Sequence, residues 1–571
     1  MCGIAGVVDK NPGFVNEAIL GKMAETIRHR GPDHQGVWIS DSGLAGFSHR
    51  RLSIIDLNPS GNQPMQSSDG RFTIVFNGEI YNYVELRNQL VSQGFNFRSS
   101  SDTEVLLALY EKKGTAFLED LDGMFSMAIW DEQNCTLFCA RDRFGEKPFF
   151  YNATGDRFVF ASEIKAIRTC MDGLDPDLDL LQEVLLSGRQ PKNDEACFKG
   201  VSVLPPASFL IWSSGRTRLE RYWHLTVPPL ESTMSESEMV ERFDELLNIS
   251  IRRRLRSDVP YGSSLSGGID SSVLVCRIRQ LDEGSFSTFS ARFKGSRDEG
   301  RWIQEVIGKT GLVNKQVWPD PSEMLNELGD LLWHHEYPIA SASVFAQWSV
   351  MRLAKENGIK VLLDGQGADE YLAGYDELKY YAMWSMYRTG RWSSFFRERR
   401  FLRKNTGGRS GLGYKFLLDP LLLPLGIQRP VFKNGVTLKE QLQFHVLNKL
   451  GELLRYADRN SMAHSVEVRL PFLFHPLVEF AFSLPDRMIY RNGYTKFILR
   501  EASRSTLPNA IYSRTDKIGY EPPQSNWLSG PDWKDLLHDS RLHLKELGID
   551  PGPDQFRILV VSALLKRFSR S

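Results

Sequence analysis

The 571-residue sequence predicts an α+β unit followed by an α/β unit whose C-terminal part is helical. Short alternating apolar runs separated by Gly, Asn and Asp turns fill the first 200 residues, with two helical stretches among them. From Glu236 onward a long helix, an apolar strand and a second helix follow one another. We expect two domains, residues 1–205 and 206–571, because Pro205-Pro206 opens a stretch with further prolines up to residue 229.

The elements of the first unit follow from its local patterns. The apolar run 3–8 and the run 72–76 predict strands, and Asn77-Gly78-Glu79 predicts a turn after the second. Helical spacing then covers 80–91 and stops at Gly94. Another helix begins at Ser101-Asp102-Thr103-Glu104, where Asp102 could cap the helix or face a ligand. Strands of a second sheet are expected at 123–130, 136–140, 148–151 and 158–162.

The second unit opens with alternating helices and strands. Helical periodicity predicts a helix over 236–256, and the apolar run 259–265 predicts a strand that leads into a helix over 271–281. A Pro- and Ser-rich connection over 228–237 precedes them.

Composition excludes several classes of partner. Lys plus Arg equals Asp plus Glu at 70 each, so we expect no binding to nucleic acid or to an anionic membrane. The apolar stretch 416–427 is interrupted by Asp419, Pro420 and Pro424 and is too short for a membrane span. Six cysteines without a CxxC pattern and no secretory signal before Cys2 favour the cytoplasm.

Cys2 is the most informative residue. Removal of Met1 would leave a thiol and a free α-amine on one residue, and an α-amine with a pKa of about 8 can take the thiol proton near neutral pH. The alternative is a small buried hydrophobe, which is the usual state of a free cysteine.

Other polar groups of the first unit could serve this thiol. Arg51 could grip a carboxylate, and Asn77 with Gly78 offers an amide and an open backbone N–H for an oxyanion. Glu79 and Asp102 could bind an α-ammonium group. Alternatively, these residues are a surface arginine, a turn and a helix cap.

Several motifs occur together in the first unit: Cys2-Gly3-Ile4-Ala5-Gly6, Arg28-His29-Arg30-Gly31-Pro32-Asp33, Arg51-Leu52-Ser53-Ile54, Phe76-Asn77-Gly78-Glu79-Ile80-Tyr81-Asn82 and Ser101-Asp102-Thr103-Glu104. In this order they resemble the glutaminase domain of class II glutamine amidotransferases, which implies an N-terminal-nucleophile αββα sandwich. By this resemblance Cys2 attacks the glutamine amide, and Asn77 and Gly78 stabilise the oxyanion. The implied glutamine-binding residues are Arg51, Leu52, Ser53, Ile54, Ile55, Asn77, Gly78, Glu79 and Asp102.

The second unit carries two loops suited to a nucleotide. Small residues from Gly262 to Ser272 follow a strand and leave backbone N–H groups free for phosphate oxygens, and Asp270 offers a hard oxygen to Mg²⁺. A second apolar strand leads into Asp364-Gly365-Gln366-Gly367-Ala368-Asp369-Glu370. Because ligands collect at the carboxyl ends of strands in open α/β sheets, both loops could face one nucleotide. Each loop alone could also be an ordinary strand-to-helix turn.

Ser266-Gly267-Gly268-Ile269-Asp270-Ser271-Ser272 resembles the pyrophosphate loop of ATP pyrophosphatases, and almost the whole chain is similar to B-type glutamine-hydrolysing asparagine synthetases. Further motifs that carry this likeness are Ala140–Pro148, Arg455–Ala463, Glu467–Leu473 and Tyr494–Arg500. The resemblance implies a Rossmann-like second domain that uses ATP and Mg²⁺. It assigns ATP and pyrophosphate binding to Leu265, Ser266, Gly267, Gly268, Asp270, Ser271, Ala291, Asp364 and Gly365, metal binding to Asp270 and Asp369, and a catalytic cation to Lys496.

Three residues depart from the family's pattern. Gln366 stands where many members have a glutamate linked to the acyl-adenylate step, Phe474 replaces an aspartate, and Asp364 replaces a serine. Glutamine cannot take up a proton. The acceptor carboxylate is therefore aspartate or another acid, such as a sugar uronic acid of a surface polysaccharide, and a catalytically silent nucleotide-binding relative is a third alternative. The expected partners are glutamine and the acceptor, with a homodimer as the expected assembly.

Overall fold

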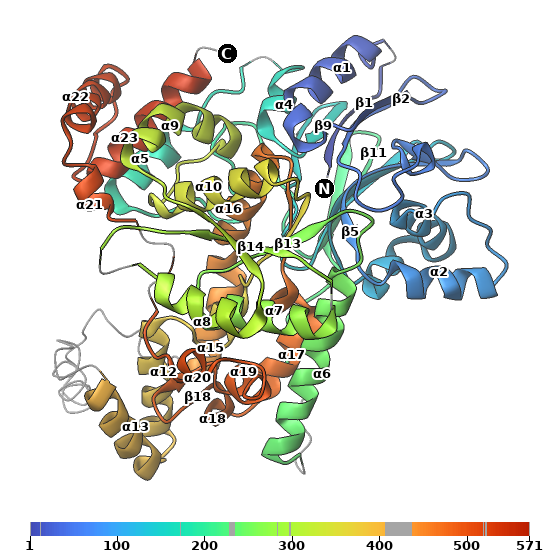
Figure 1. Cartoon of the computed structure of the whole chain (residues 1–571). Coiled ribbons are helices and arrows are strands. Elements are labelled where there is room, and N and C mark those ends of the chain that lie inside the picture. The colour runs from blue at the N-terminus through green and yellow to red at the C-terminus, as the bar shows by residue number, and fades with distance from the viewer. Residues whose placement is uncertain are drawn as a thin grey trace.

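The computed structural model describes the chain except residues 1, 12, 172, 228–233, 283, 296–297, 406–436, 518, 520–521 and 570–571. The stretch 416–427 lies outside the described residues. Figure 1 shows the N-terminal sheets on one side of the molecule, with the later helices beside and below them. No helix among the described residues is both long and apolar enough to cross a membrane.

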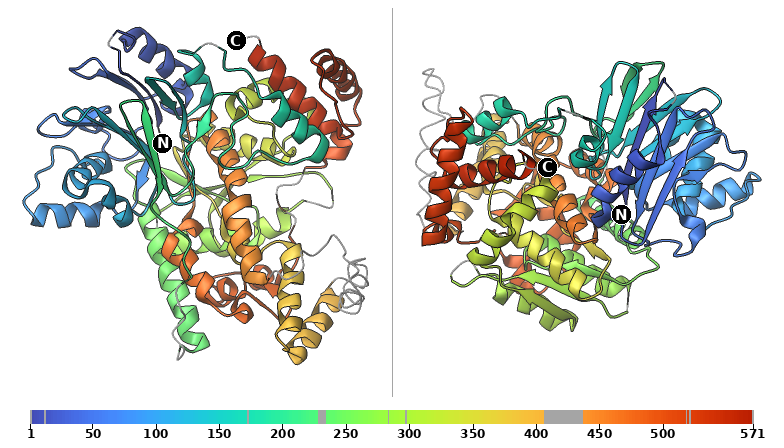
Figure 2. Two further views of the ribbon diagram at one scale, coloured as in Figure 1. Left: turned by 180° about the vertical axis from the view of Figure 1, so that it is seen from behind. Right: turned by 90° about the horizontal axis from the view of Figure 1, so that it is seen from above.

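Two antiparallel sheets form the first part of the chain, and the views from the front and from above show them side by side (Figures 1 and 2). One sheet has the order β10 (Ser202–Val203), β8 (Phe150–Thr154), β9 (Arg157–Ala161), β1 (Gly3–Asp9), β3 (Ala45–Arg51) and β2 (His34–Ile39). The other has the order β12 (Arg216–Arg221), β11 (Ser208–Ser213), β7 (Thr136–Arg141), β6 (Gly123–Asp131), β5 (Phe72–Ile80) and β4 (Met65–Gln66).

A buried apolar core joins the two sheets, with Ile4 and Phe47 from the first facing Val75 and Trp130 from the second. Helices α1 (Glu17–Thr26) and α4 (Ile164–Arg168) pack on the outer side of the first sheet. Helices α2 (Tyr83–Ser92) and α3 (Asp102–Lys113) pack on the outer side of the second. The predicted αββα layering is therefore confirmed.

The structure corrects two details of the sequence prediction. Residues 150–154 and 157–161 pair with each other and with β1, so they belong to a different sheet from β6 and β7. Asn77-Gly78-Glu79 is no turn, because it continues β5 and pairs with Ser126, Phe125 and Met124 of β6. A Cβ added at Gly78 would lie 2.1 Å from the carbonyl oxygen of Met124, so this glycine serves a close approach between strands.

Strands β11 and β12 follow Pro205-Pro206, yet β11 pairs with β7. The second sheet therefore extends past the boundary expected at residue 205. The next helix, α6 (Glu236–Arg254), begins at a capping box in which Ser235 and Glu238 satisfy each other's backbone N–H groups.

A five-stranded parallel sheet organises the rest of the chain, in the order β15 (Val313–Val317), β14 (Ser287–Ala291), β13 (Tyr261–Ser264), β16 (Val361–Leu363) and β17 (Glu467–Arg469). Strand order reverses at β13, which lies between β14 and β16, so the loops after β13 and β16 open into one crevice. In Figure 1, helices α7 (Ile269–Leu281) and α8 (Gly300–Thr310) lie below this sheet, and α10 (Ser343–Glu356) and α16 (Leu450–Ala463) lie above it.

Further helices surround the sheet. The C-terminal pair α22 (Pro531–Glu546) and α23 (Gln555–Ser569) packs together, and α23 contacts both α9 (Pro321–His335) and α5 (Leu178–Ser187) of the first part. The others include α11 (Ala368–Tyr371), α12 (Asp376–Arg388), α13 (Trp392–Asn405), α15 (Leu438–Phe444), α17 (His475–Ser483), α19 (Phe497–Ala502) and α20 (Asn509–Ser513).

Candidate functional site

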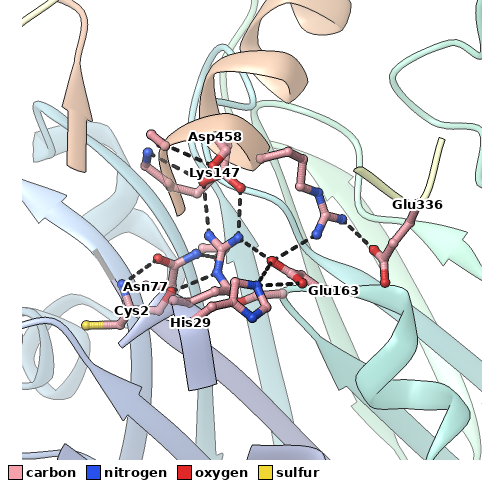
Figure 3. A network of polar contacts seen from close by, with 12 residues as sticks. Cys2, His29, Asn77, Lys147, Glu163, Glu336 and Asp458 are labelled. Atoms are coloured by element: carbon pink, nitrogen blue, oxygen red, sulfur yellow. Dashed lines mark hydrogen bonds and ion pairs between the residues drawn. The ribbon is translucent and has the colours of Figure 1, made fainter. Parts of the chain in front are cut away.

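Cys2 directly precedes β1, a central strand of its sheet, and only 8% of the residue is exposed. Its backbone N–H donates to Oδ1 of Asn77 at 3.0 Å (Figure 3). Burial raises the pKa of the thiol, while the backbone N–H of Leu52 and the charge of Arg51 act in the opposite direction. The structure thus brings the cysteine to the Asn-Gly pair of β5 and to the loop that follows β3.

Two buried carboxyl groups lie beyond this pair. Oδ2 of Asp102 accepts the backbone N–H of Ile80 at 2.9 Å, and Ser101, not Asp102, caps α3. Burial raises the pKa of Asp102 to about 6, and burial together with the charge of Asp102 raises the pKa of Glu79. Oε1 of Glu79 is buried without a hydrogen-bond partner. Two such carboxyl groups suit a ligand that brings a positive charge.

Arg51 shapes the loop after β3. Its guanidinium donates to the carbonyl oxygens of Ile55, Asp56 and Asn58 and to Oδ1 of Asn62. The arginine therefore has protein acceptors where the sequence suggested a grip on a carboxylate. The loop is also tied at two other points, because Ser53 donates its N–H to Asp33 and Ile54 accepts the N–H of Asp258.

The second group of predicted residues surrounds a cavity of about 250 Å³ at the carboxyl ends of β13 and β16. The predicted residues in its lining are Ser266, Gly268, Asp270, Ser271, Asp364, Gly365, Gln366, Asp369 and Lys496. Leu265 and Gly267 of the loop after β13 and Ala291 at the end of the neighbouring β14 do not line it. The lining residues that the sequence prediction missed include Glu299, Tyr375, Arg500, Arg514 and Lys517.

The two loops pack directly on each other. A Cβ added at Gly365 would lie 2.9 Å from the backbone nitrogen of Ser271 and 3.1 Å from Cβ of Asp270. Only a glycine permits this approach without a shift of the backbone.

Lys496 lies between the two predicted metal ligands. Its ammonium group pairs with Asp270 and, at 2.5 Å, with Oδ1 of Asp369, whose other oxygen lies 2.6 Å from Nζ of Lys517. These two lysines lower the pKa of Asp369 in spite of its burial, whereas burial raises that of Asp270. The backbone of Lys496 is left-handed, with φ of 55°, which is uncommon for a residue other than glycine and is typical of functional sites.

The donor set fits a magnesium ion. Asp270 and Asp369 converge on one point and offer carboxylate oxygens, and Oδ1 of Asp270 is buried without a hydrogen-bond partner. Within the described ranges no cluster of three or more His, Cys, Asp or Glu residues could hold a metal. An ion at this point would therefore take its remaining ligands from phosphate oxygens and water.

Gln366, Asp364 and Phe474, the three residues that depart from the family pattern, are all buried or partly buried. Oε1 of Gln366 is buried without a hydrogen-bond partner. Asp364 accepts a hydrogen bond from the Ser264 hydroxyl at 3.2 Å, and burial raises its pKa. Phe474 is buried next to Arg253 and Arg254.

Sequence reasoning missed the buried charges that join the two groups of residues. We define the junction network as Arg30, Glu163, Glu336, Asp458 and Arg459 (Figure 3). Separately, Arg469 of β17 lies 3.4 Å from Oε2 of Glu79. Arg30, Asp458 and Arg459 lie in motifs that the sequence analysis singled out, but nothing in the sequence indicated their pairing because the partners are far apart along the chain.

Comparison with known proteins gives two family matches. Residues 1–223 match the glutamine amidotransferase domain, and residues 242–549 match the asparagine synthase family.

Full-length relatives agree with these matches. The chain is 32% identical to asparagine synthetase [glutamine-hydrolyzing] 1 of Bacillus subtilis, over 95% of this chain and 90% of that protein. It is 31% identical to asparagine synthetase [glutamine-hydrolyzing] 3 of the same organism, over 92% and 89% of the two chains. It is also 28% identical to amidase chry2 of Gibberella zeae, over 93% and 90%.

Proposed function

The chain belongs to the glutamine-hydrolysing asparagine synthetase family, and we propose that it uses ATP and glutamine to convert a carboxylate, most simply aspartate, into its amide. AMP, pyrophosphate and glutamate are the other products. The observation that carries this proposal is the presence, in one chain, of a thiol beside an Asn-Gly pair and a cavity of paired carboxylates and lysines.

The first reaction is the release of ammonia from glutamine. With Met1 removed, the α-amine of Cys2 takes the thiol proton, and the sulfur attacks the side-chain amide carbon. Asn77 and the backbone N–H of Gly78 stabilise the oxyanion, and a thioester of glutamate remains until water hydrolyses it. Glu79 and Asp102 bind the α-ammonium group of glutamine, which is supported by their burial and by the unpartnered oxygen of Glu79.

The second reaction activates the acceptor. A carboxylate does not lose hydroxide, so its oxygen first attacks the α-phosphate of ATP, which releases pyrophosphate and gives an acyl-adenylate. The loop from Ser266 to Ser271 binds the phosphates through backbone N–H groups. Asp270 and Asp369 would hold Mg²⁺, which would neutralise phosphate charge when bound. Lys496, whose ammonium lies between these two carboxylates, would stabilise the charge that develops on the phosphates.

Ammonia links the two reactions. In water at neutral pH it is mostly ammonium, which has no lone pair for attack, so the product of the first site has to reach the second through an enclosed route. Buried contacts between the two parts of the chain support a fixed arrangement of the two sites. We place the end of the glutaminase unit after β12 and the start of the synthetase unit at α6. A cytoplasmic location and a homodimer stay predictions.

The loop after β16 departs from the family pattern next to the expected acceptor site. Gln366 can accept a hydrogen bond from ammonia but cannot accept its proton, and Asp364 is the carboxylate of the same loop. A panel of acids tests the proposal: AMP release is measured with ATP and glutamine in the presence of aspartate or of sugar uronic acids. AMP release with aspartate alone supports asparagine synthesis, release with a uronic acid supports the alternative, and no release with any acid contradicts both.

A further inference from the structure

Arg30 joins the thiol site to the second part of the chain, by which we mean the parallel sheet and the helices from α6 onward. The first part is the pair of antiparallel sheets and the helices that precede α6. The guanidinium of Arg30 is fully buried, and each of its three nitrogen atoms donates at least one hydrogen bond. Nε donates to the carbonyl oxygen of Cys2 at 3.1 Å. Nη1 donates to Glu163 and to Asp458, both at 2.9 Å, and Nη2 donates to the other oxygen of Asp458 at 3.0 Å.

The partners of Arg30 come from both parts of the chain. Glu163 precedes α4 of the first part, whereas Asp458 lies on α16 of the second. Asp458 of the second part therefore holds the planar guanidinium through two parallel hydrogen bonds. The N–H on Nε of Arg30 in turn holds the backbone carbonyl of Cys2, the nucleophile.

The rest of the junction network restricts these two carboxylates. Glu163 lies 3.1 Å from Arg459, the neighbour of Asp458 on α16, and Arg459 donates to Glu336 at 2.8 Å. Glu336 in turn accepts the backbone N–H groups of Ile164 and Lys165 at 2.9 and 2.6 Å. Buried charges of the two parts thus pair with each other, Arg30 with Asp458 and Glu163 with Arg459. Each of these charges depends on its partner from the other part, because an uncompensated buried charge is costly.

We propose that Arg30 is a positioning residue for Cys2 and that Asp458 holds Arg30 in place, so that glutamine hydrolysis in the first part depends on contact with the second part. This inference rests on the proposed function for its link to glutamine. A loss of contact between the two parts would remove the bidentate partner of Arg30, the carbonyl of Cys2 would lose its fixed donor, and the thiol would no longer point at the amide carbon. Release of ammonia would thereby be restricted to the docked state.

The test uses the full chain with Asp458→Asn, which is nearly isosteric but removes the charge, and with Arg30→Lys, which keeps the charge but loses the fork. Glu85→Gln is the matched control, because Glu85 pairs with Arg256 across the same junction at a more exposed point, away from Cys2. We expect Asp458→Asn and Arg30→Lys to lower kcat for glutamine hydrolysis by about 10- to 100-fold. KM for glutamine and turnover with ammonium salts should stay the same, and Glu85→Gln should match the parent in all three quantities.

A second measurement separates this inference from the proposed function. The rate at which iodoacetamide alkylates Cys2, followed by mass spectrometry of the N-terminal peptide, reports the thiol without any substrate. A changed alkylation rate in Asp458→Asn, with partial recovery in Asp458→Glu, supports the positioning role. This conclusion holds even if the parent protein fails to hydrolyse glutamine, a result that would refute only the proposed function. An unchanged alkylation rate and an unchanged kcat, or equal losses with glutamine and with ammonium salts, would overturn the positioning role.

Discussion

The backbone N–H of Cys2, the residue before β1 of one sheet, donates to Oδ1 of Asn77 on β5 of the other sheet at 3.0 Å. The bond brings Cys2 next to the Asn-Gly pair, the groups to which the proposed function assigns attack on the glutamine amide and stabilisation of the oxyanion.

Substitution Cys2→Ala should therefore abolish turnover with glutamine while ammonium salts still support amide formation. The reason is that the cavity at Lys496 shares no lining residue with the thiol site. Product formation from each nitrogen source is the measurement. Cys135→Ala is the control, because this thiol is exposed. Equal loss with both nitrogen sources in Cys2→Ala would contradict the division of labour.

Replacement of Asp270 by Asn should block pyrophosphate exchange that depends on the acceptor carboxylate, because the amide neither pairs with Lys496 nor supplies a charged oxygen to Mg²⁺. Glutamine hydrolysis at Cys2 should persist. Asp282→Asn, at the other end of α7, is the control. Exchange that continues at the parental rate in Asp270→Asn would remove this residue from the metal site.

The KM for glutamine should depend on pH through Asp102. Burial raises the pKa of this carboxyl to about 6, so it becomes neutral as the pH falls through that value and loses its attraction for the α-ammonium group. We expect KM to rise below about pH 6, whereas a carboxyl with its ordinary pKa near 4 would keep KM constant down to about pH 5. Asp102→Asn should give a high KM without this step, and a flat profile in the parent would contradict the assignment.

Lys496→Met should lower the Tm of the protein by several degrees in the absence of Mg²⁺, because Asp270 and Asp369 would then face each other without the cation between them. Added Mg²⁺ should restore part of the loss, since it binds the same oxygens. Thermal unfolding with and without Mg²⁺ measures both effects, and Lys534→Met at an exposed position of α22 serves as the control. A Tm that neither falls nor responds to Mg²⁺ would show that the two carboxylates form no cation site.

Apolar periodicity predicted most strands and helices because it is a local property, whereas the αββα layers and most of the expected site residues were implied by the resemblance to glutamine amidotransferases and asparagine synthetases. The sequence pattern wrongly predicted a turn at Asn77-Gly78, since that pair usually ends a strand, whereas here β6 continues the pairing. It also indicated no partner for Arg30. Asp458 lies 428 residues further along the chain, and such a pair depends on how the two parts pack rather than on any local pattern. The same holds for Glu79 and Arg469, which are 390 residues apart.

The absence of a side chain at Gly365 lets two segments that are far apart in the sequence pack directly on each other. The segment that follows β16 rests on the segment that follows β13 with no room for a methyl group between them. A side chain at position 365 would therefore push Gln366, the next residue, away from Asp270 and widen the cavity between the two loops.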